Sequence, residues 1–232
     1  MRGYGYIWRK NMNVTLWVDI CLQIGKAIPV TLELTVVSFI LALILAVTVA
    51  VVEYFNIPVL KQIGNIYVSF FRGTPQIPQI FLLYFGIPSI IPSLRDISPF
   101  IVCIIALTLN SGAYMKEVVR GALLAVPNGQ KEAALAHGMT QRQAMFRIVL
   151  PQATRVAVPS LFNNLVDTIK GSSLAFTVGV IEMTAAAKLK AAVTFDYFAA
   201  YVILMLMYWA IILLLERVEK NAEKKLAHGY ER

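Results

Sequence analysis

Segment 28–52 constrains the fold more than any other part of the sequence, because it is a long apolar run with a single charge, Glu33. At about 1.5 Å per residue, a helix of this length crosses the hydrocarbon core of a bilayer with some tilt. Composition agrees, since 58% of the 232 residues are apolar and 15% are charged, against roughly 45–50% and about 25% in soluble domains. The chain is therefore predicted to be an all-α, polytopic membrane protein.

Further hydrophobic segments follow the first, which predicts about five transmembrane helices in total. The additional segments are 77–91, 99–119, 148–169 and 195–215. The first of these is short for a full span and carries Pro78 and Pro88. A later apolar segment, 171–188, is too short to cross, so we expect a re-entrant or interfacial piece there. The predicted organisation is an N-terminal extracytoplasmic or interfacial segment at 1–27, a transmembrane domain at 28–217 and a cytoplasmic tail at 218–232.

Basic residues stand beside the hydrophobic segments, so the net charge of +8 is attributed to membrane topology and anionic lipid rather than to nucleic acid. The loop between the third and fourth spans is rich in bases, whereas the loop near Arg95 and Asp96 is almost uncharged. The positive-inside rule therefore makes the base-rich loop and the C-terminus cytoplasmic, although Arg2, Arg9 and Lys10 count against this orientation. The bases of the loop and its margins are Arg120, Lys131, Arg142, Arg147 and Arg155.

Enzyme and metal chemistry find little support in the sequence. Cys21 and Cys103 do not have the spacing of metal ligands, and Cys103 lies in an apolar run. Nothing resembles the glycine-rich phosphate loop used for nucleotide hydrolysis. An intramembrane enzyme would need paired acids, or serine with histidine, inside the spans, but His137 and His228 are both predicted to be cytoplasmic. We expect no catalytic residue, no metal and no cofactor in this chain.

A polar, helix-forming segment, 132–151, stands between the third and fourth spans. The turn at 127–129 lets Asn128 cap a following helix. Residues 131–137 have high helix propensity, and Gly138 is suited to end the helix. A short helix of this kind cannot bury its own surface. It is either a docking element for a soluble partner or an ordinary interfacial loop helix.

This segment resembles the EAA motif of ABC-importer permeases. That motif is EAA, three residues, G, nine residues and I-x-L-P, and every fixed position is met. The stretches FRGTP, LTLNSGAYMKEVVRGALLAVPNGQ and KGSSLAFTVGVIEM add to the likeness. Together they are similar to the polar amino acid permeases of the type I importer family, over about 29–215. The motif positions are Glu132, Ala133, Ala134, Gly138, Ile148, Leu150 and Pro151.

The resemblance implies the type I ABC importer permease fold, with 128–151 as a coupling loop whose helix sits in a cleft of a separate ATPase. It also implies three kinds of partner: an ATPase dimer that binds ATP and Mg, a second permease subunit (identical or paralogous), and an extracytoplasmic solute-binding protein. The chain would be a multi-pass protein of a bacterial cytoplasmic (inner) membrane, in contact with lipid, and would work by alternating access. A channel would not need the EAA segment.

A stripe of polar residues on the fourth span marks a candidate substrate path. Its members lie at offsets of 0, 3, 4 and 7, so they share one face of a helix. Such a face is costly in contact with lipid, so it should face the protein interior or water. The alternative is an internal polar network, such as Asp167 with Lys170, that fixes helix packing. The stripe consists of Ser160, Asn163, Asn164 and Asp167.

The break at Gly73 is a second candidate. Thr74 is predicted to cap a new helix there, with Pro75 at its first position. A helix N-terminus at membrane depth offers free N–H groups to a substrate carboxylate, and Thr74 and Gln76 are assigned to the path on this ground. The alternative is a hinge that only kinks the second span.

Gly171 bears on the substrate. Many amino acid permeases of the family have an acidic residue where this chain has Gly171, and the version with glycine resembles the cystine-type members. The expected substrate is therefore a polar L-amino acid, with cystine favoured. The alternative is a permease of the same family for another small solute, such as an opine or a polyamine.

Overall fold

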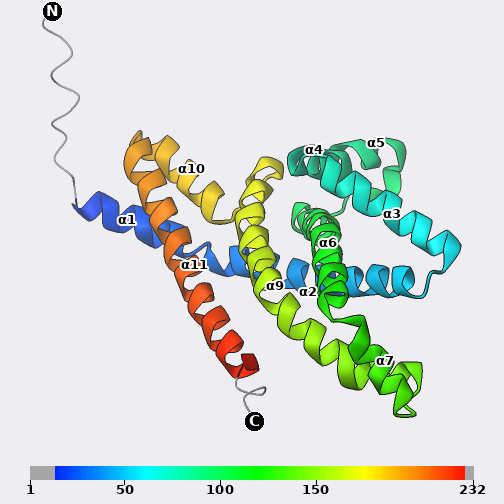
Figure 1. The fold of residues 1–232 in the computed structure, drawn as a ribbon. Coiled ribbons are helices and arrows are strands. Elements are labelled where there is room, and N and C mark those ends of the chain that lie inside the picture. The colour runs from blue at the N-terminus through cyan, green and yellow to red at the C-terminus, as the bar shows by residue number, and fades with distance from the viewer. Residues whose placement is uncertain (1–13, 228–232) are drawn as a thin grey trace, which may run out of the picture.

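The computed structural model describes residues 14–227, and every regular element within them is helical (Figure 1). The predicted all-α class is therefore confirmed for this part of the chain. Residues 1–13 of the predicted N-terminal segment and 228–232 of the predicted tail lie outside the described residues. The elements are α1 Val14–Gly25, α2 Ile28–Tyr54, α3 Pro58–Gly73, α4 Gln76–Phe81, η1 Leu82–Gly86, α5 Ile87–Ile90, η2 Pro92–Leu94, α6 Pro99–Ala125, α7 Asn128–Ala136, α8 Gln141–Ala144, η3 Met145–Val149, α9 Leu150–Ser172, η4 Ser173–Val178, α10 Met183–Thr194 and α11 Tyr197–Ala227.

Three helical runs among the described residues are long and apolar enough to cross a membrane: Val14–Tyr54, Pro99–Ala125 and Tyr197–Lys225. A fourth candidate is bent, because Gln141–Val178 and Met183–Thr194 meet at 50° across a short break. The shorter apolar run Gln76–Ile90 takes the place of the predicted segment 77–91. The five predicted hydrophobic segments lie largely in helices, but only three of them, or four with the bent pair, are long and apolar enough to count as spans. The second is as short as its sequence indicated. The bend agrees with the re-entrant or interfacial piece predicted after the fourth span.

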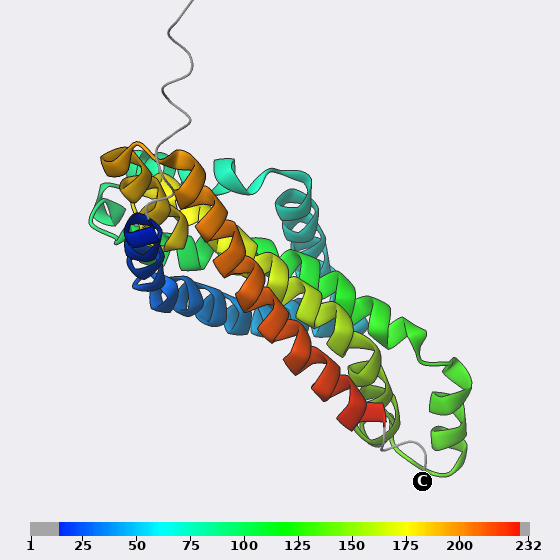
Figure 2. The ribbon, with the colours of Figure 1, turned by 90° about the vertical axis from the view of Figure 1, so that its left-hand side faces the viewer.

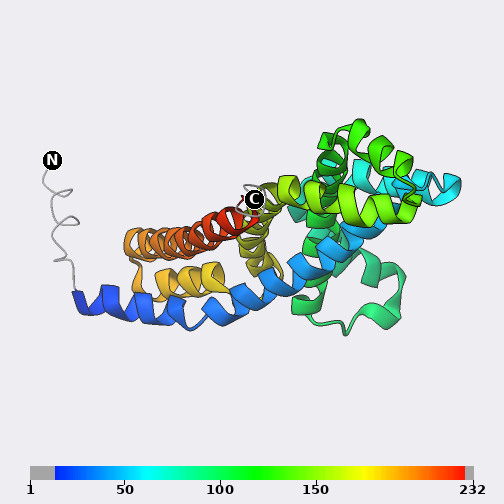
Figure 3. The same ribbon diagram turned by 60° about the horizontal axis from the view of Figure 1, so that its bottom comes forward.

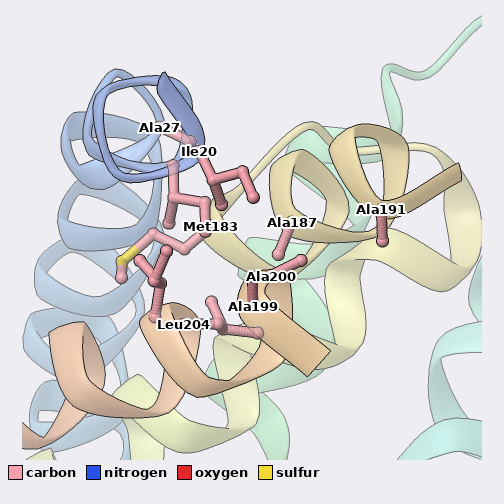
Figure 4. Packing of buried hydrophobic residues seen from close by; sticks show 10 residues of the cluster. Ile20, Ala27, Met183, Ala187, Ala191, Ala199, Ala200 and Leu204 are labelled. Carbon is pink, nitrogen blue, oxygen red and sulfur yellow. The ribbon is translucent and has the colours of Figure 1, made fainter. Parts of the chain in front are cut away.

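The first run begins earlier than the sequence suggested, because α1 continues almost directly into α2. Figure 3 shows the two as one long rod that reaches from α10 and α11 to the helices around α6. Ile20 of α1 is fully buried, and Figure 4 shows it beside Met183 among small alanine side chains of α10 and α11. Asp19 of α1 is paired with Lys190 of α10 at 2.5 Å. Because Lys190 pairs with it, the acidic Asp19 is tolerated inside α1. The sequence alone did not predict this helix.

Small residues bring α2 and α6 close together. Ala42 and Ala46 of α2 are fully buried, and the Ala42 carbonyl oxygen lies 3.3 Å from where a Cβ on Gly112 would stand. Beside them, Tyr67 of α3 donates a hydrogen bond to the Leu109 carbonyl at 2.7 Å. Lipid tails are as apolar as the helices, so close backbone approach and interhelical hydrogen bonds are what hold such helices together.

Two π-helical turns, η1 and η3, interrupt the helical runs, and a proline follows each: Pro88 after η1 and Pro151 after η3. Proline has no N–H, and its ring crowds the carbonyl four residues earlier. A wider turn relieves this crowding without ending the helix.

The two ends of the bundle differ in what they carry. The short helices α4 and α5, together with α10, lie at one end, while α7 and the C-terminal end of α11 lie at the other (Figures 1 and 2). The predicted coupling loop and the C-terminal end of α11 therefore lie at the same end of the molecule.

Candidate functional site

The helix α7 holds the centre of the predicted coupling loop at one end of the bundle. Glu132 and Ala133 are exposed on it, whereas Ala134 is 6% exposed. On the inner side, Lys131 donates a hydrogen bond to the Tyr54 hydroxyl of α2 at 3.0 Å and lies over its ring. One side of α7 thus rests on the bundle, and the side with Glu132 is open.

The prediction that Asn128 caps this helix is wrong. Asn128 is the first residue of α7, and Pro127 takes the N-cap position without a side-chain hydrogen bond. Pro127 has an extended ψ of 133°, and helical geometry begins at the next residue. The Asn128 side chain therefore stands one position too late to act as the cap.

Gly138 ends α7, as predicted, with a left-handed backbone, φ +79°. The Gly138 N–H donates to the Leu135 carbonyl at 3.0 Å, and the Met139 N–H donates to the Ala134 carbonyl at 3.1 Å. This pair of bonds is the Schellman arrangement, which satisfies carbonyls at a helix end and favours glycine. Thr140 then begins α8 with a capping box that Gln143 completes. Both ends of the turn after α7 are therefore fixed by local sequence.

The last part of the motif folds into the helix that carries the polar stripe. Ile148 lies in η3 and is partly buried, while Leu150 and Pro151 open α9 and are exposed. The motif therefore begins on α7 and ends on α9. It covers the whole connection at this end of the bundle.

A pocket of about 280 Å³ brings together three of the six residues predicted for the substrate path. Gln76 contributes from the start of α4, and Asn164 and Asp167 contribute from α9. Polar side chains from the middle of α6 complete the wall; they are Asn110, Ser111 and Tyr114. Ordinary ligand pockets span about 300–1,000 Å³, so this one is at the small end.

Hydrogen bonds fix the walls of the pocket. Asn110 donates to the Gln79 Oε1 at 3.0 Å, and Gln79 donates to the Thr74 hydroxyl at 2.8 Å. Gln79 is 3% exposed, so a buried amide links α6 to the break between α3 and α4. On the other side, the hydroxyls of Ser111 and Thr168 lie 3.0 Å apart and join α6 to α9.

The other three predicted path residues do not line this pocket. Ser160 accepts a hydrogen bond at its carbonyl from Asn164 at 2.8 Å, and Asn163 is exposed. The prediction that Thr74 caps the next helix is wrong by one residue. Thr74 donates back to the Phe70 carbonyl at 2.8 Å, and Pro75 takes the N-cap position before Gln76. The chain break predicted at Gly73 is present, and Thr74 acts at the end of α3.

Charged groups lie at the edge of the pocket. Asp167 is 3.7 Å from Lys170, and both side chains are more than half exposed, so this pair is no buried packing network. The guanidinium of Arg72 lies 5.5 Å from the centre of the Tyr114 ring. A carboxylate on α9 and a guanidinium at the end of α3 thus stand on different elements near one polar pocket.

Gly171 lies against the same pocket. A Cβ there would stand 3.1 Å from Gln76 Oε1 and 3.3 Å from Leu107 Cδ2. These separations are tighter than ordinary contacts, so any larger side chain at this position would displace the Gln76 amide.

The three α6 residues and Gln79 were not among the residues predicted for the substrate path. An amide within the apolar run 77–91 was the available signal for Gln79, because a buried amide needs partners. Tyr114 carried no such signal, since a tyrosine in a span is commonly placed there for its ring.

Comparison with known proteins identifies the family of the chain. A family model described as the binding-protein-dependent transport system inner membrane component matches residues 40–228. The chain therefore belongs to this family of membrane transport components.

Within that family, the similarity is to amino-acid permeases. The chain is 45% identical over 207 residues to a probable amino-acid ABC transporter permease, PatM, of Vibrio harveyi, covering 89% of this chain and 93% of that protein. It is 32% identical to the L-cystine transport system permease TcyL of Bacillus subtilis (strain 168), covering 96% and 95%. The predicted resemblance is thereby confirmed, and the function is that of an amino-acid ABC transporter permease subunit.

Solved structures support the same fold. A crystal structure of an amino acid ABC transporter with histidines superposes with a TM-score of 0.83 at 28% identity, covering 90% of this chain and 96% of that one. An inward-facing structure of the methionine ABC transporter MetNI superposes with a TM-score of 0.75 at 19% identity, covering 90% and 98%. The predicted permease fold is confirmed, and the chain is a multi-pass membrane protein.

Proposed function

We propose that this chain forms one half of the membrane pathway of an ATP-driven importer, and that α7 is its docking element for a separate ATPase. The observation that carries the proposal is that the EAA pattern folds as a short exposed helix at one end of the bundle, with Glu132 and Ala133 open to a partner. Gly138 and Thr140 fix the turn that follows. A rigid, protruding helix of this kind can pass displacement of a partner to α6 and α9.

ATP and Mg belong on the ATPase dimer in this proposal, and this chain contributes no cofactor of its own. A second permease subunit, identical or paralogous, supplies the opposite wall of the path, since polar side chains in lipid are costly. An extracytoplasmic solute-binding protein delivers the substrate at the other end. The C-terminal end of α11 lies at the α7 end, and we propose that the tail after it is cytoplasmic, because α7 would meet the ATPase on the cytoplasmic side of a bacterial inner membrane.

The pocket suits the zwitterion of an L-amino acid. The Asp167 carboxylate is placed to attract the substrate ammonium group, and the amides of Gln76 and Asn164 are placed to hydrogen-bond the carboxylate. Arg72, at the edge of the pocket across Tyr114, adds positive charge for the same carboxylate. Ser160, Asn163 and Thr74 are proposed to lie along the path outside the pocket.

Gly171 favours a substrate whose side chain carries no net charge. Its lack of a side chain leaves the Gln76 amide in place, and it brings no second carboxylate to neutralise a cationic substrate. We therefore propose a polar neutral amino acid, with cystine favoured. The similarity to L-cystine permeases of Bacillus subtilis supports this choice. An opine or polyamine permease remains the competing specificity.

The docking role is tested by charge reversal on α7. Glu132→Lys should leave the permease inserted while the ATPase no longer co-purifies with it and uptake is lost, because a like charge at a close contact opposes binding. Asn221→Lys, an exposed position on α11 outside the coupling loop, is the control and should keep the ATPase. Normal co-purification and uptake with Glu132→Lys would remove the basis of the proposal.

The pocket is tested by labelling in liposomes that contain the importer. Cysteines placed at Asn164 and Asp167 should react with a polar thiol reagent. In the importer that keeps both residues, uptake of cystine should exceed uptake of arginine or of a polyamine. Cysteines at Leu165 and Val166 are the controls on the same helix and should react poorly. Stripe positions that stay unreactive would favour a packing role for the polar stripe instead of a path.

Pairing of two permease subunits has its own test. The purified complex should contain two permease subunits with two ATPases, and cysteines placed on the two permease subunits should crosslink across the symmetry axis. A particle that takes up substrate with a single permease subunit would contradict this part of the proposal.

A further inference from the structure

A buried lysine lies where α2 and α6 meet, close to α7. Lys116 of α6 is 3% exposed, and its ammonium pairs with Glu53 near the C-terminal end of α2. It also pairs with Glu117 at 2.8 Å, and Glu117 binds Arg120 at 2.8 Å. Ionisable groups inside a predicted span are expensive, so their presence calls for a role.

Tyr54, the next residue of α2, connects this group of ion pairs to α7. Tyr54 follows Glu53 and accepts the hydrogen bond from Lys131 at 3.0 Å. The Lys131 ammonium also lies 5.5 Å from the centre of the Tyr54 ring. Two consecutive residues of α2 are thus held by lysines of two different elements, α6 and α7.

Chain connectivity explains why α2 needs these contacts. α6 joins α7 through Val126 and Pro127, and α7 joins α8 through the short turn after it. When α7 moves, α6 and α8 are pulled by the chain itself. Between α2 and α7, however, the chain passes through α3, α4, α5 and α6, so α2 can follow α7 only through noncovalent contacts.

We propose that the Glu53–Lys116 ion pair and the Tyr54–Lys131 hydrogen bond act as one polar strap that makes α2 move together with α6 and α7. Replacing a buried ion pair by apolar residues often costs little stability, whereas separating its partners leaves a buried charge unpaired, so this pair opposes any movement that parts Lys116 from Glu53. Lys116 and Lys131 are therefore positioning residues for transport, and neither touches substrate. The inference rests on the proposed role of α7 as the docking element.

The test measures uptake per ATP hydrolysed by the assembled importer in liposomes. Tyr54→Phe removes only the hydroxyl, and Lys131→Gln removes the cation at an exposed contact, so neither should unfold the chain. Both should bind the ATPase and hydrolyse ATP, but uptake per ATP should fall about fivefold or more, the lower range of ordinary coupling between sites. Lys131→Arg keeps a cationic hydrogen-bond donor, so its uptake per ATP should match that of the unchanged importer. If Lys131 only stabilised the fold, uptake per ATP would not depend on whether the residue at this position is a cation.

Lys61→Gln is the matched control, because the exposed hydrogen bond of Lys61 at 2.8 Å goes to Asn56, just beyond the end of α2, and not to α7. It should leave uptake per ATP unchanged. An unchanged ratio in both Tyr54→Phe and Lys131→Gln would overturn the strap. Failure of the proposed function would give a different result: the Glu132→Lys variant would still bind the ATPase and take up substrate.

Discussion

Gly112→Ala should weaken the packing of α2 against α6. The added Cβ would stand 2.8 Å from the Tyr67 hydroxyl, 3.2 Å from Leu45 Cδ2 and 3.3 Å from the Ala42 carbonyl oxygen. The first distance is shorter than real contacts allow, so Tyr67 must move and its hydrogen bond to Leu109 must lengthen.

The magnitude follows from three contributions. Overpacking costs about 1–3 kcal/mol, and the loss of a hydrogen bond costs about 1 kcal/mol. The better helix propensity of alanine returns about 1 kcal/mol. The net destabilisation is about 1–3 kcal/mol, or roughly 2–12 °C in the unfolding midpoint of a chain of this size.

Gly121→Ala is the matched control, because it is the same substitution in the same helix. A Cβ on Gly121 would meet nothing within 4 Å, so this variant should unfold at the same temperature or slightly higher. Thermal unfolding of both variants in one detergent, followed by loss of monodisperse protein, gives the comparison. A Gly112→Ala variant as stable as Gly121→Ala would refute the close-approach account of α2 and α6.

Other predictions concern caps and turns. Glu182→Ala should destabilise the chain by about 3 kcal/mol. The fully buried Glu182 carboxylate accepts hydrogen bonds from the Thr184 and Ala185 amides at 2.8 Å and from the Tyr208 hydroxyl at 3.1 Å. The unfolding midpoint of the variant should drop clearly, and an unchanged midpoint would contradict the capping role. Gly138→Val should cost about 1–2 kcal/mol of strain at φ +79°, whereas Gly138→Asn, a residue that tolerates this conformation, should cost less. Hydrogen exchange at 131–144 should rise with valine and much less with asparagine, and equal exchange would argue against strain.

The sequence was most informative where local chemistry decides the structure. α6 begins at Pro99, as predicted, and Ser98 caps it by accepting from the Ile101 N–H at 3.3 Å. Gly138 ends α7 for a reason that is also local, the left-handed turn. Apolar runs of span length were recognised because lipid imposes a minimum helix length.

The sequence was least informative where a distant partner decides. α1 was placed in an interfacial segment, since the pairing of Asp19 with Lys190 cannot be read from the sequence around Asp19. Likewise, Thr74 had two local partners to choose from, and the fold uses the Phe70 carbonyl behind it. The pocket needed tertiary structure as well, because the part of α6 that carries Tyr114 meets α4 and α9 only after folding.

The π-helical turn η3 affects which single-residue deletions the chain can tolerate near the start of α9. A π turn holds one residue more than the α-helical turn it replaces. Loss of one codon within Met145–Val149 would leave an ordinary turn in which the Pro151 ring again crowds the carbonyl four residues earlier, and it would also shorten the motif that runs from Glu132 to Pro151. Loss of one codon between Gln152 and Val158 would instead rotate everything beyond it by about 100°, and Asn164 and Asp167 would leave the pocket. Length variation among descendants of this gene should therefore be purged from 145–149 as well as from the first half of α9.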